Sequence, residues 1–191
     1  MSQQIEIERK TMLTEAEFEL LLKKLPFESA PIIQTNYYFE TEDLALKRNR
    51  SALRIRQKNN SYTLTLKEPH EEGVLETNEP LTEVEAKKWL QNKPIPTGKI
   101  ANQLEALSIC LEDLRYIGSL KTERYTYSKD DIHFMLDKSF YLQTIDYELE
   151  IEATSLRQAE EEMCQILLDY DIEERTALPK IARFFHKADE L

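Results

Sequence analysis

Length, composition and charge limit the classes of protein to which this chain can belong. Its 191 residues suit a single domain over 1–191 with a sizeable core. Its net charge of -11 argues against a nucleic-acid binder, which would usually carry a basic surface. Its 3 glycines form neither a Walker A loop nor a GxGxxG loop. With no signal peptide and no long apolar run, we expect a soluble, cytoplasmic protein without a membrane partner.

Cysteines and histidines give no sign of a metal or nucleophile site. Cys110 and Cys164 lie in apolar stretches without a second Cys or a His at metal-ligand spacing. We interpret both as buried thiols. The three histidines have no partner pattern, and we expect surface or structural roles for them: His70, His133 and His186.

The first predicted element is a strand over residues 5–10. Because successive side chains of a strand alternate, Glu6, Glu8 and Lys10 share one face. The two carboxylates then lie about 6.6 Å apart, with a cation one step further along. Arg9 points to the other face.

Further strands and helices follow in chain order. Capping boxes at Thr14–Glu17 and Thr82–Glu85 and a cap at Ser155 predict helix starts, and Pro94 and Pro96 end the second helix. Alternation predicts strands over 32–40, 51–58, 61–68, 73–79, 115–127, 132–137 and 140–152, with hairpin turns at 59–60, 129–131 and 138–139. Shorter helices are expected near 41–49, over 100–107 and after Pro179. About eight strands, mostly joined by hairpins, predict an α+β fold dominated by antiparallel strands, with a closed barrel as one arrangement.

Charged side chains are sorted by sign from strand to strand. One acidic row consists of Glu6 and Glu8, and a second, on a later strand, consists of Glu148, Glu150 and Glu152. The basic residues are Arg54, Arg56 and Lys58 on one strand, Lys67 on the next, and Lys121 and Arg124 on a later strand. Like charges along one strand face repel, so a solvated face has little reason to be sorted in this way. Carboxylates suit a divalent metal, and arginines suit phosphate oxygens. The pattern therefore predicts a metal–polyphosphate site.

The ordered set of motifs resembles the CYTH family, also called triphosphate tunnel metalloenzymes. The Glu-x-Glu-x-Lys signature is matched by Glu6, Glu8 and Lys10. The similarity continues through residues 37–41, 53–56, 63–67, 124–125, 148–152 and 180–184, in the expected order over nearly the whole chain.

The resemblance implies an eight-stranded antiparallel β-barrel, a tunnel lined with charges and flanked by helices, in which Mg²⁺ or Mn²⁺ assists hydrolysis of a triphosphate. It implies catalytic and metal-side carboxylates at Glu6, Glu8, Glu150 and Glu152, with Glu148 as an alternative ligand to Glu152. It implies substrate-binding cations at Lys10, Arg54, Arg56, Lys67, Arg124 and Lys180, joined by Arg183 and, through a strand bulge, by Lys121. Glu76 is a further candidate to line the tunnel.

Three functions remain open at this stage. The leading hypothesis is a metal-dependent triphosphatase acting on inorganic triphosphate or a small organic triphosphate such as thiamine triphosphate. The alternatives are an adenylate cyclase that converts ATP to cyclic AMP, and a module that binds polyphosphate without turnover. The expected partner is a triphosphate-containing small molecule; a homodimer and the number of metals, one or two, stay open.

Overall fold

The computed structural model describes residues 2–94 and 98–190. Within these residues the chain forms nine strands and six α-helices, which divide into two compact units. The first unit comprises residues 2–6 and 34–120, and the second comprises residues 7–33 and 121–190. The prediction of one domain over 1–191 is not tested by this division and stays a prediction.

The first unit is built on an antiparallel sheet in the order β1-β6-β5-β4-β3. The order along the chain is different, because β1 (Ser2–Glu6) pairs with the distant β6 (Gly73–Leu81). The meander between them is β3 (Ile32–Thr41), β4 (Ala52–Lys58) and β5 (Ser61–His70). Asn59, with φ 55, occupies the left-handed conformation of the β4–β5 turn, as its residue type predicted.

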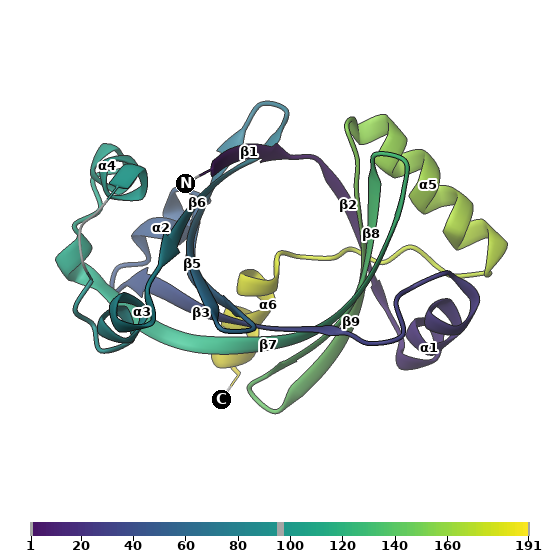
Figure 1. The fold of residues 1–191 in the computed structure, drawn as a ribbon, viewed down its shortest axis with the longest axis horizontal. Coiled ribbons are helices and arrows are strands. Elements are labelled where there is room, and N and C mark those ends of the chain that lie inside the picture. The colour runs from purple at the N-terminus through teal and green to yellow at the C-terminus, as the bar shows by residue number, and fades with distance from the viewer. Residues whose placement is uncertain (1, 95–97, 191) are drawn as a thin grey trace. The chain divides into compact units, whose positions relative to one another are not determined.

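Helices cover one face of this sheet. The face carries Leu53, Ile55, Leu64 and Leu66, which form a core with Trp89. The helices are α2 (Ala45–Arg48), α3 (Glu83–Leu90) and α4 (Gly98–Ala106), and a 3-10 turn follows at Leu111–Asp113 (Figure 1). The predicted capping box of Thr82 and Glu85 starts α3. This helix ends before Pro94, whereas Pro96 lies outside the described residues.

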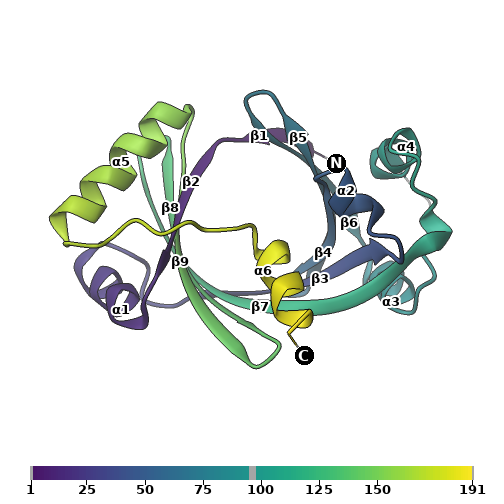
Figure 2. The ribbon, with the colours of Figure 1, turned by 180° about the vertical axis from the view of Figure 1, so that it is seen from behind.

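The second unit has its own antiparallel ladder, β7-β8-β9-β2. Its strands are the second half of β7 (Leu114–Lys129), then β8 (Ile132–Tyr141), β9 (Thr144–Glu152) and β2 (Glu8–Leu13). The face with Leu136, Leu149 and Ile151 packs against Phe18 of α1 (Glu15–Lys24) and Met163 of α5 (Leu156–Asp169). Figure 2 shows the last helix, α6 (Lys180–Ala188), on the opposite side of these strands from α1 and α5. That opposite face carries the charged rows.

The predicted first strand is wrong as a single element. β1 ends at Glu6 and β2 begins at Glu8, so nine strands are present where about eight were expected. The reason is a change of partner: Val74 of β6 faces Glu6, whereas Glu152 of β9 faces Glu8. Ile7, between the strands, accepts a hydrogen bond from the Ala153 backbone N–H. The two signature glutamates consequently belong to different units.

The predicted turn at residues 138–139 is also wrong. β8 continues to Tyr141, and the turn lies at Leu142 and Gln143, which have φ values of 43 and 61. Ser139 stays in the strand because it is buried opposite Thr122 of β7.

Both cysteines are exposed, which corrects the expectation of buried thiols. In α5 the buried positions are Ala159, Met163, Ile166 and Leu167, so Cys164 falls on the outward side of that helix.

Candidate active site

The polar face of the second unit brings acidic and basic rows into register. Across the β7–β8–β9 ladder, Arg124 lies opposite Asp137, which lies opposite Glu148. On the other side of β9, Lys10 of β2 lies opposite Glu150. The alternation that buries Leu149 and Ile151 against the helices therefore directs these charged side chains to the face on which α6 lies.

Three buried carboxylates converge on this face. Asp137, Glu148 and Glu150 each offer an oxygen, and these oxygens all lie within 4.8 Å of one another. Sequence analysis missed Asp137 because it placed a turn directly after that residue. The signal was present in the alternation of Ile132, Phe134 and Leu136, which leaves Asp137 on the opposite face of a continued strand.

Cations from β7 and from α6 enclose the carboxylates. Arg124 donates to both oxygens of Asp137, at 2.7 and 2.6 Å, and also pairs with Glu150. Lys180 Nζ lies 2.9 Å from Asp137 Oδ2, 2.5 Å from Glu148 Oε1 and 2.6 Å from Glu150 Oε1. Arg183 pairs with Glu148 and, at 2.9 Å, with Asp146. Three cations are therefore paired with four carboxylates in this cluster.

Burial and charge push the pKa values of the two neighbouring glutamates apart. Burial raises the pKa of Glu148 to about 7, because Glu150 adds to the effect while Lys180 only partly opposes it. Burial acts in the same direction on Glu150, but Lys180 and Arg124 outweigh it and hold the pKa of that carboxyl well below its usual range. One carboxyl can thus exchange a proton near neutral pH while its neighbour stays ionised.

Glu8, Lys10 and Glu152 extend the charged face along β2 and β9. Lys10 Nζ donates to Glu8 Oε1 at 2.5 Å. Burial opposes the charge of Lys10, but Glu8 and Glu150 outweigh it and raise the pKa of the lysine. Glu152 lies opposite Glu8 at the end of β9 and is only half-buried. Of the two alternatives left open by the sequence, Glu148 is the one that lies with Asp137 and Glu150.

The first unit carries a charge cluster of its own. Lys67 pairs with Glu6 and, at 3.1 Å, with Glu76, which Arg54 also contacts at 3.3 Å. Burial raises the pKa of Glu6 to about 7 despite Lys67. Burial opposes ionisation of Glu76 too, but Arg54 and Lys67 outweigh it and lower the pKa of that carboxyl strongly. Glu76, a further candidate from the sequence, therefore lies at the centre of this cluster.

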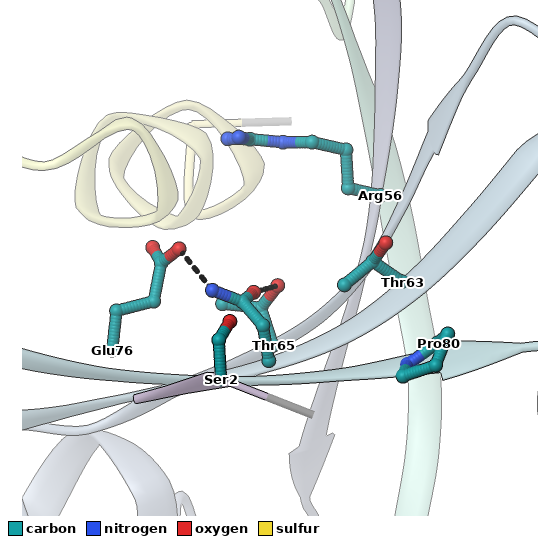
Figure 3. Close-up of a pocket in the computed structure, with 7 residues that line it drawn as sticks. Ser2, Arg56, Thr63, Thr65, Glu76 and Pro80 are labelled. Carbon is teal, nitrogen blue, oxygen red and sulfur yellow. Dashed lines mark hydrogen bonds between the residues drawn. The ribbon is translucent and has the colours of Figure 1, made fainter. Parts of the chain in front are cut away.

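A cavity of about 430 Å³ lies beside this cluster in the first unit. Its lining residues come from β1, β4, β5 and β6: Ser2, Arg56, Thr63, Thr65, Glu76, Asn78 and Pro80 (Figure 3). Arg56 reaches toward it from β4 and donates from Nε to Asn36 Oδ1 at 3.1 Å. The lining combines one cation and one carboxylate with hydroxyl and amide groups.

Several buried donors in these clusters lack an acceptor. Within the described part of the chain, no hydrogen-bond partner is found for Arg54 Nε, Asn36 Nδ2 or Arg183 Nη2. An unpaired buried donor costs about 1–3 kcal/mol, so such groups favour a ligand rich in acceptors. Phosphate oxygens are acceptors of this kind.

Lys121 does not join the other predicted cations. The β7–β8 register is continuous at Lys121 and Thr122, so no bulge shifts the lysine. Thr122 is buried on the same face as Arg124, whereas Lys121 is exposed and pairs with Glu123 at 3.1 Å. The remaining predicted residues fall in two groups: Glu6, Arg54, Arg56 and Lys67 in the first unit, and Glu8, Lys10, Arg124, Glu148, Glu150, Glu152, Lys180 and Arg183 in the second.

Comparison with protein families matches nearly the whole chain. The family model described as the CYTH domain matches residues 4–185. The chain belongs to the CYTH family. Both halves of the charged pattern, from Glu6 to Arg183, lie inside the matched residues.

Two relatives are similar to this CYTH chain over nearly its full length. One is the Bacillus subtilis (strain 168) protein named "Putative triphosphatase YjbK", 39% identical over 188 residues that cover 98% of this chain and 97% of the relative. The other is a Bacillus halodurans crystal structure described as "a putative adenylate cyclase", with 42% identity and a TM-score of 0.92, covering 97% of this chain and 100% of the other.

A protein from Hippeastrum shares the fold at lower identity. Its structure is described as that of a "putative adenylyl cyclase HpAC1" with a dominant triphosphatase activity, and it has a TM-score of 0.77 and 24% identity over 95% of each chain. These likenesses confirm the predicted CYTH-type α+β fold with antiparallel strands. None of the helices in residues 2–94 and 98–190 is long and apolar enough to cross a membrane.

Proposed function

We propose that this CYTH protein is a metal-dependent triphosphatase that hydrolyses inorganic triphosphate or a small organic triphosphate. The observation that carries the proposal is the convergence of Asp137, Glu148 and Glu150, enclosed by cations on the same face. The family membership and the relative named as a triphosphatase support the same reaction class.

The carboxylate cluster fits the divalent metal that the family implies. Its donors are all carboxylate oxygens, the hard ligands that Mg²⁺ and Mn²⁺ prefer. Asp137, Glu148 and Glu150 would hold the ion, with Glu8 and Glu152 next to them on β2 and β9. When bound, the metal neutralises charge on the phosphate oxygens.

The cations of each unit are suited to phosphate oxygens. In the second unit these are Lys10, Arg124, Lys180 and Arg183, of which Arg183 keeps an unpaired donor at Nη2. In the first unit Arg56 lines the polar cavity, and Glu76, also in its lining, pairs with Arg54 and Lys67. Arginine contributes bidentate contacts that align a chain of phosphates.

A carboxylate of the acidic row activates the attacking water. This role falls to a glutamate that does not ligate the metal, because a bound divalent cation lowers the pKa of a ligand carboxylate and makes it a poor base. No nucleophilic side chain is required, because catalysis of phosphoryl transfer is mainly positioning and charge stabilisation.

The adenylate cyclase alternative has one observation in its favour, the description of the Bacillus halodurans relative. A cyclase also needs a pocket for adenine. The cavity in the first unit is lined by hydroxyl, amide and charged groups, and none of the residues described as lining it, within 2–94 and 98–190, is an aromatic on which a base could stack. We therefore place hydrolysis first.

The test is a phosphate-release screen with Mg²⁺ and Mn²⁺ over inorganic triphosphate, thiamine triphosphate and ATP. Glu8→Gln should abolish metal-dependent turnover while the protein stays folded. Arg56→Ala should weaken triphosphate binding measured by calorimetry, and the exposed Arg48→Ala is its matched control. Formation of cyclic AMP and pyrophosphate from ATP would show a cyclase and contradict hydrolysis. Triphosphate binding without phosphate release would favour the non-catalytic binding module.

A further inference from the structure

The ammonium group of Lys180 lies among all three carboxylates of the cluster. Its Nζ contacts Asp137, Glu148 and Glu150 at 2.9, 2.5 and 2.6 Å. The lysine side chain is 10% exposed, and the three carboxylates are 0, 1 and 9% exposed. A cation of this chain therefore already occupies the position that the carboxylates offer to a metal.

The lysine and a divalent ion cannot use these oxygens together. Mg²⁺ draws its oxygen ligands to about 2.0–2.1 Å, whereas the ammonium contacts the same three carboxylates at hydrogen-bond distance. Two cations placed among three oxygens would also repel each other strongly in so buried a position. A metal can enter only when the ammonium leaves.

The chain leaves the lysine free to move while its helix stays docked. Lys180 is the first residue of α6, and Arg183 anchors that helix to Asp146 and Glu148. The segment before the helix is tied to β2, where the Met12 backbone N–H donates to the Arg175 carbonyl at 3.2 Å. The four-carbon stem of a lysine can redirect its ammonium group without moving the helix.

We propose that Lys180 is a built-in competitor of the metal, so that tight metal binding requires triphosphate. In the metal-free protein the ammonium group neutralises the ligand carboxylates. Phosphate oxygens draw it away, and the carboxylates then accept the divalent ion. By thermodynamic reciprocity the metal strengthens triphosphate binding by the same factor. The inference rests on the proposed function, since it takes the metal ligands from there.

The experiment measures Mn²⁺ binding by equilibrium dialysis and electron paramagnetic resonance, without turnover. Wild type is compared with Lys180→Met, which keeps the stem and removes the charge. Lys121→Met is the matched control, because that exposed lysine has the same charge and forms its ion pair with Glu123, outside the carboxylate cluster. Circular dichroism checks that each variant is folded, and Lys180→Gln replaces Lys180→Met if the latter is not.

Without substrate, Lys180→Met should bind Mn²⁺ at least tenfold more tightly than wild type, and Lys121→Met should match wild type. Adding a non-hydrolysable imidotriphosphate should tighten Mn²⁺ binding to wild type more than to Lys180→Met. Equal or weaker Mn²⁺ binding by the folded Lys180 variants would overturn the inference and leave the proposed metal site intact. No protein-bound Mn²⁺ in any variant, with or without the analogue, would overturn both.

Discussion

Asp137 is the carboxylate on which the charged face of the second unit depends most. Its side chain is 0% exposed. It accepts two hydrogen bonds from Arg124 and forms an ion pair with Lys180. Replacing it by asparagine removes the charge and turns amide donors toward cations that are themselves donors. Removing one partner of a buried ion pair costs about 3–5 kcal/mol. Because Glu150 also contacts both cations, we expect the lower end, about 3 kcal/mol.

Urea unfolding followed by fluorescence and circular dichroism measures this loss. With a slope of about 2 kcal/mol/M, the Asp137→Asn midpoint should fall by about 1.5 M. The control is Asp131→Asn, in the exposed turn between β7 and β8, which should shift the midpoint by less than about 0.3 M. Equal midpoints for the two variants would refute the reasoning, because they would mean that the buried network does not form in solution.

Two further predictions concern backbone packing and pH. A Cβ added at Gly73 would lie 2.2 Å from the Glu6 carbonyl oxygen. Gly73→Ala should therefore lower the free energy of unfolding in urea by about 1–3 kcal/mol and should disturb the β1–β6 pairing. The control variant Glu72→Ala should do neither. Arg175 donates to both oxygens of Glu17 at 2.8 and 3.0 Å; burial opposes ionisation, but hydrogen bonds from Arg175 and Thr14 outweigh it and lower the pKa of Glu17 from 4.5. A carboxyl whose pKa is lowered by folding stabilises the folded state at pH values above its unfolded pKa, and this stabilisation is lost as the pH falls. The difference in unfolding free energy between wild type and Arg175→Gln should therefore be constant near neutrality and should shrink below about pH 4.5. A gap that grows toward low pH in the urea midpoints would contradict this assignment.

Most secondary structure was predictable because its signals are local. Capping boxes at Thr14 and Thr82 start α1 and α3 where the sequence indicated. Alternation in β4, β5 and β9 identified which side chains face the core and which face the charged side. The errors at Ile7 and at residues 138–139 arose where a partner strand, and not the local pattern, determines where a strand breaks or continues.

The sequence predicted the types of residue in the site, but only some of the individual residues. Glu148, Glu150, Arg124 and Lys180 were expected, and the tertiary structure brings them into contact. Asp137 was missed because its role depends on register with Arg124 and Glu148 on neighbouring strands. Lys121 was included on the assumption of a bulge that the continuous register excludes.

The sequence by itself determined that charges are sorted by sign on alternating strand faces, because a strand's period of two is a local property of the backbone. It also determined the helix starts and the family. The tertiary structure decided which charges meet: it separated Glu6 from Glu8 by sending β1 and β2 to different partners, and it added Asp137 to the carboxylates. It also placed the ammonium group of Lys180 among them. Strand pairing joins residues far apart in the chain, and the free energy of that pairing depends on the whole sheet and not on any one segment.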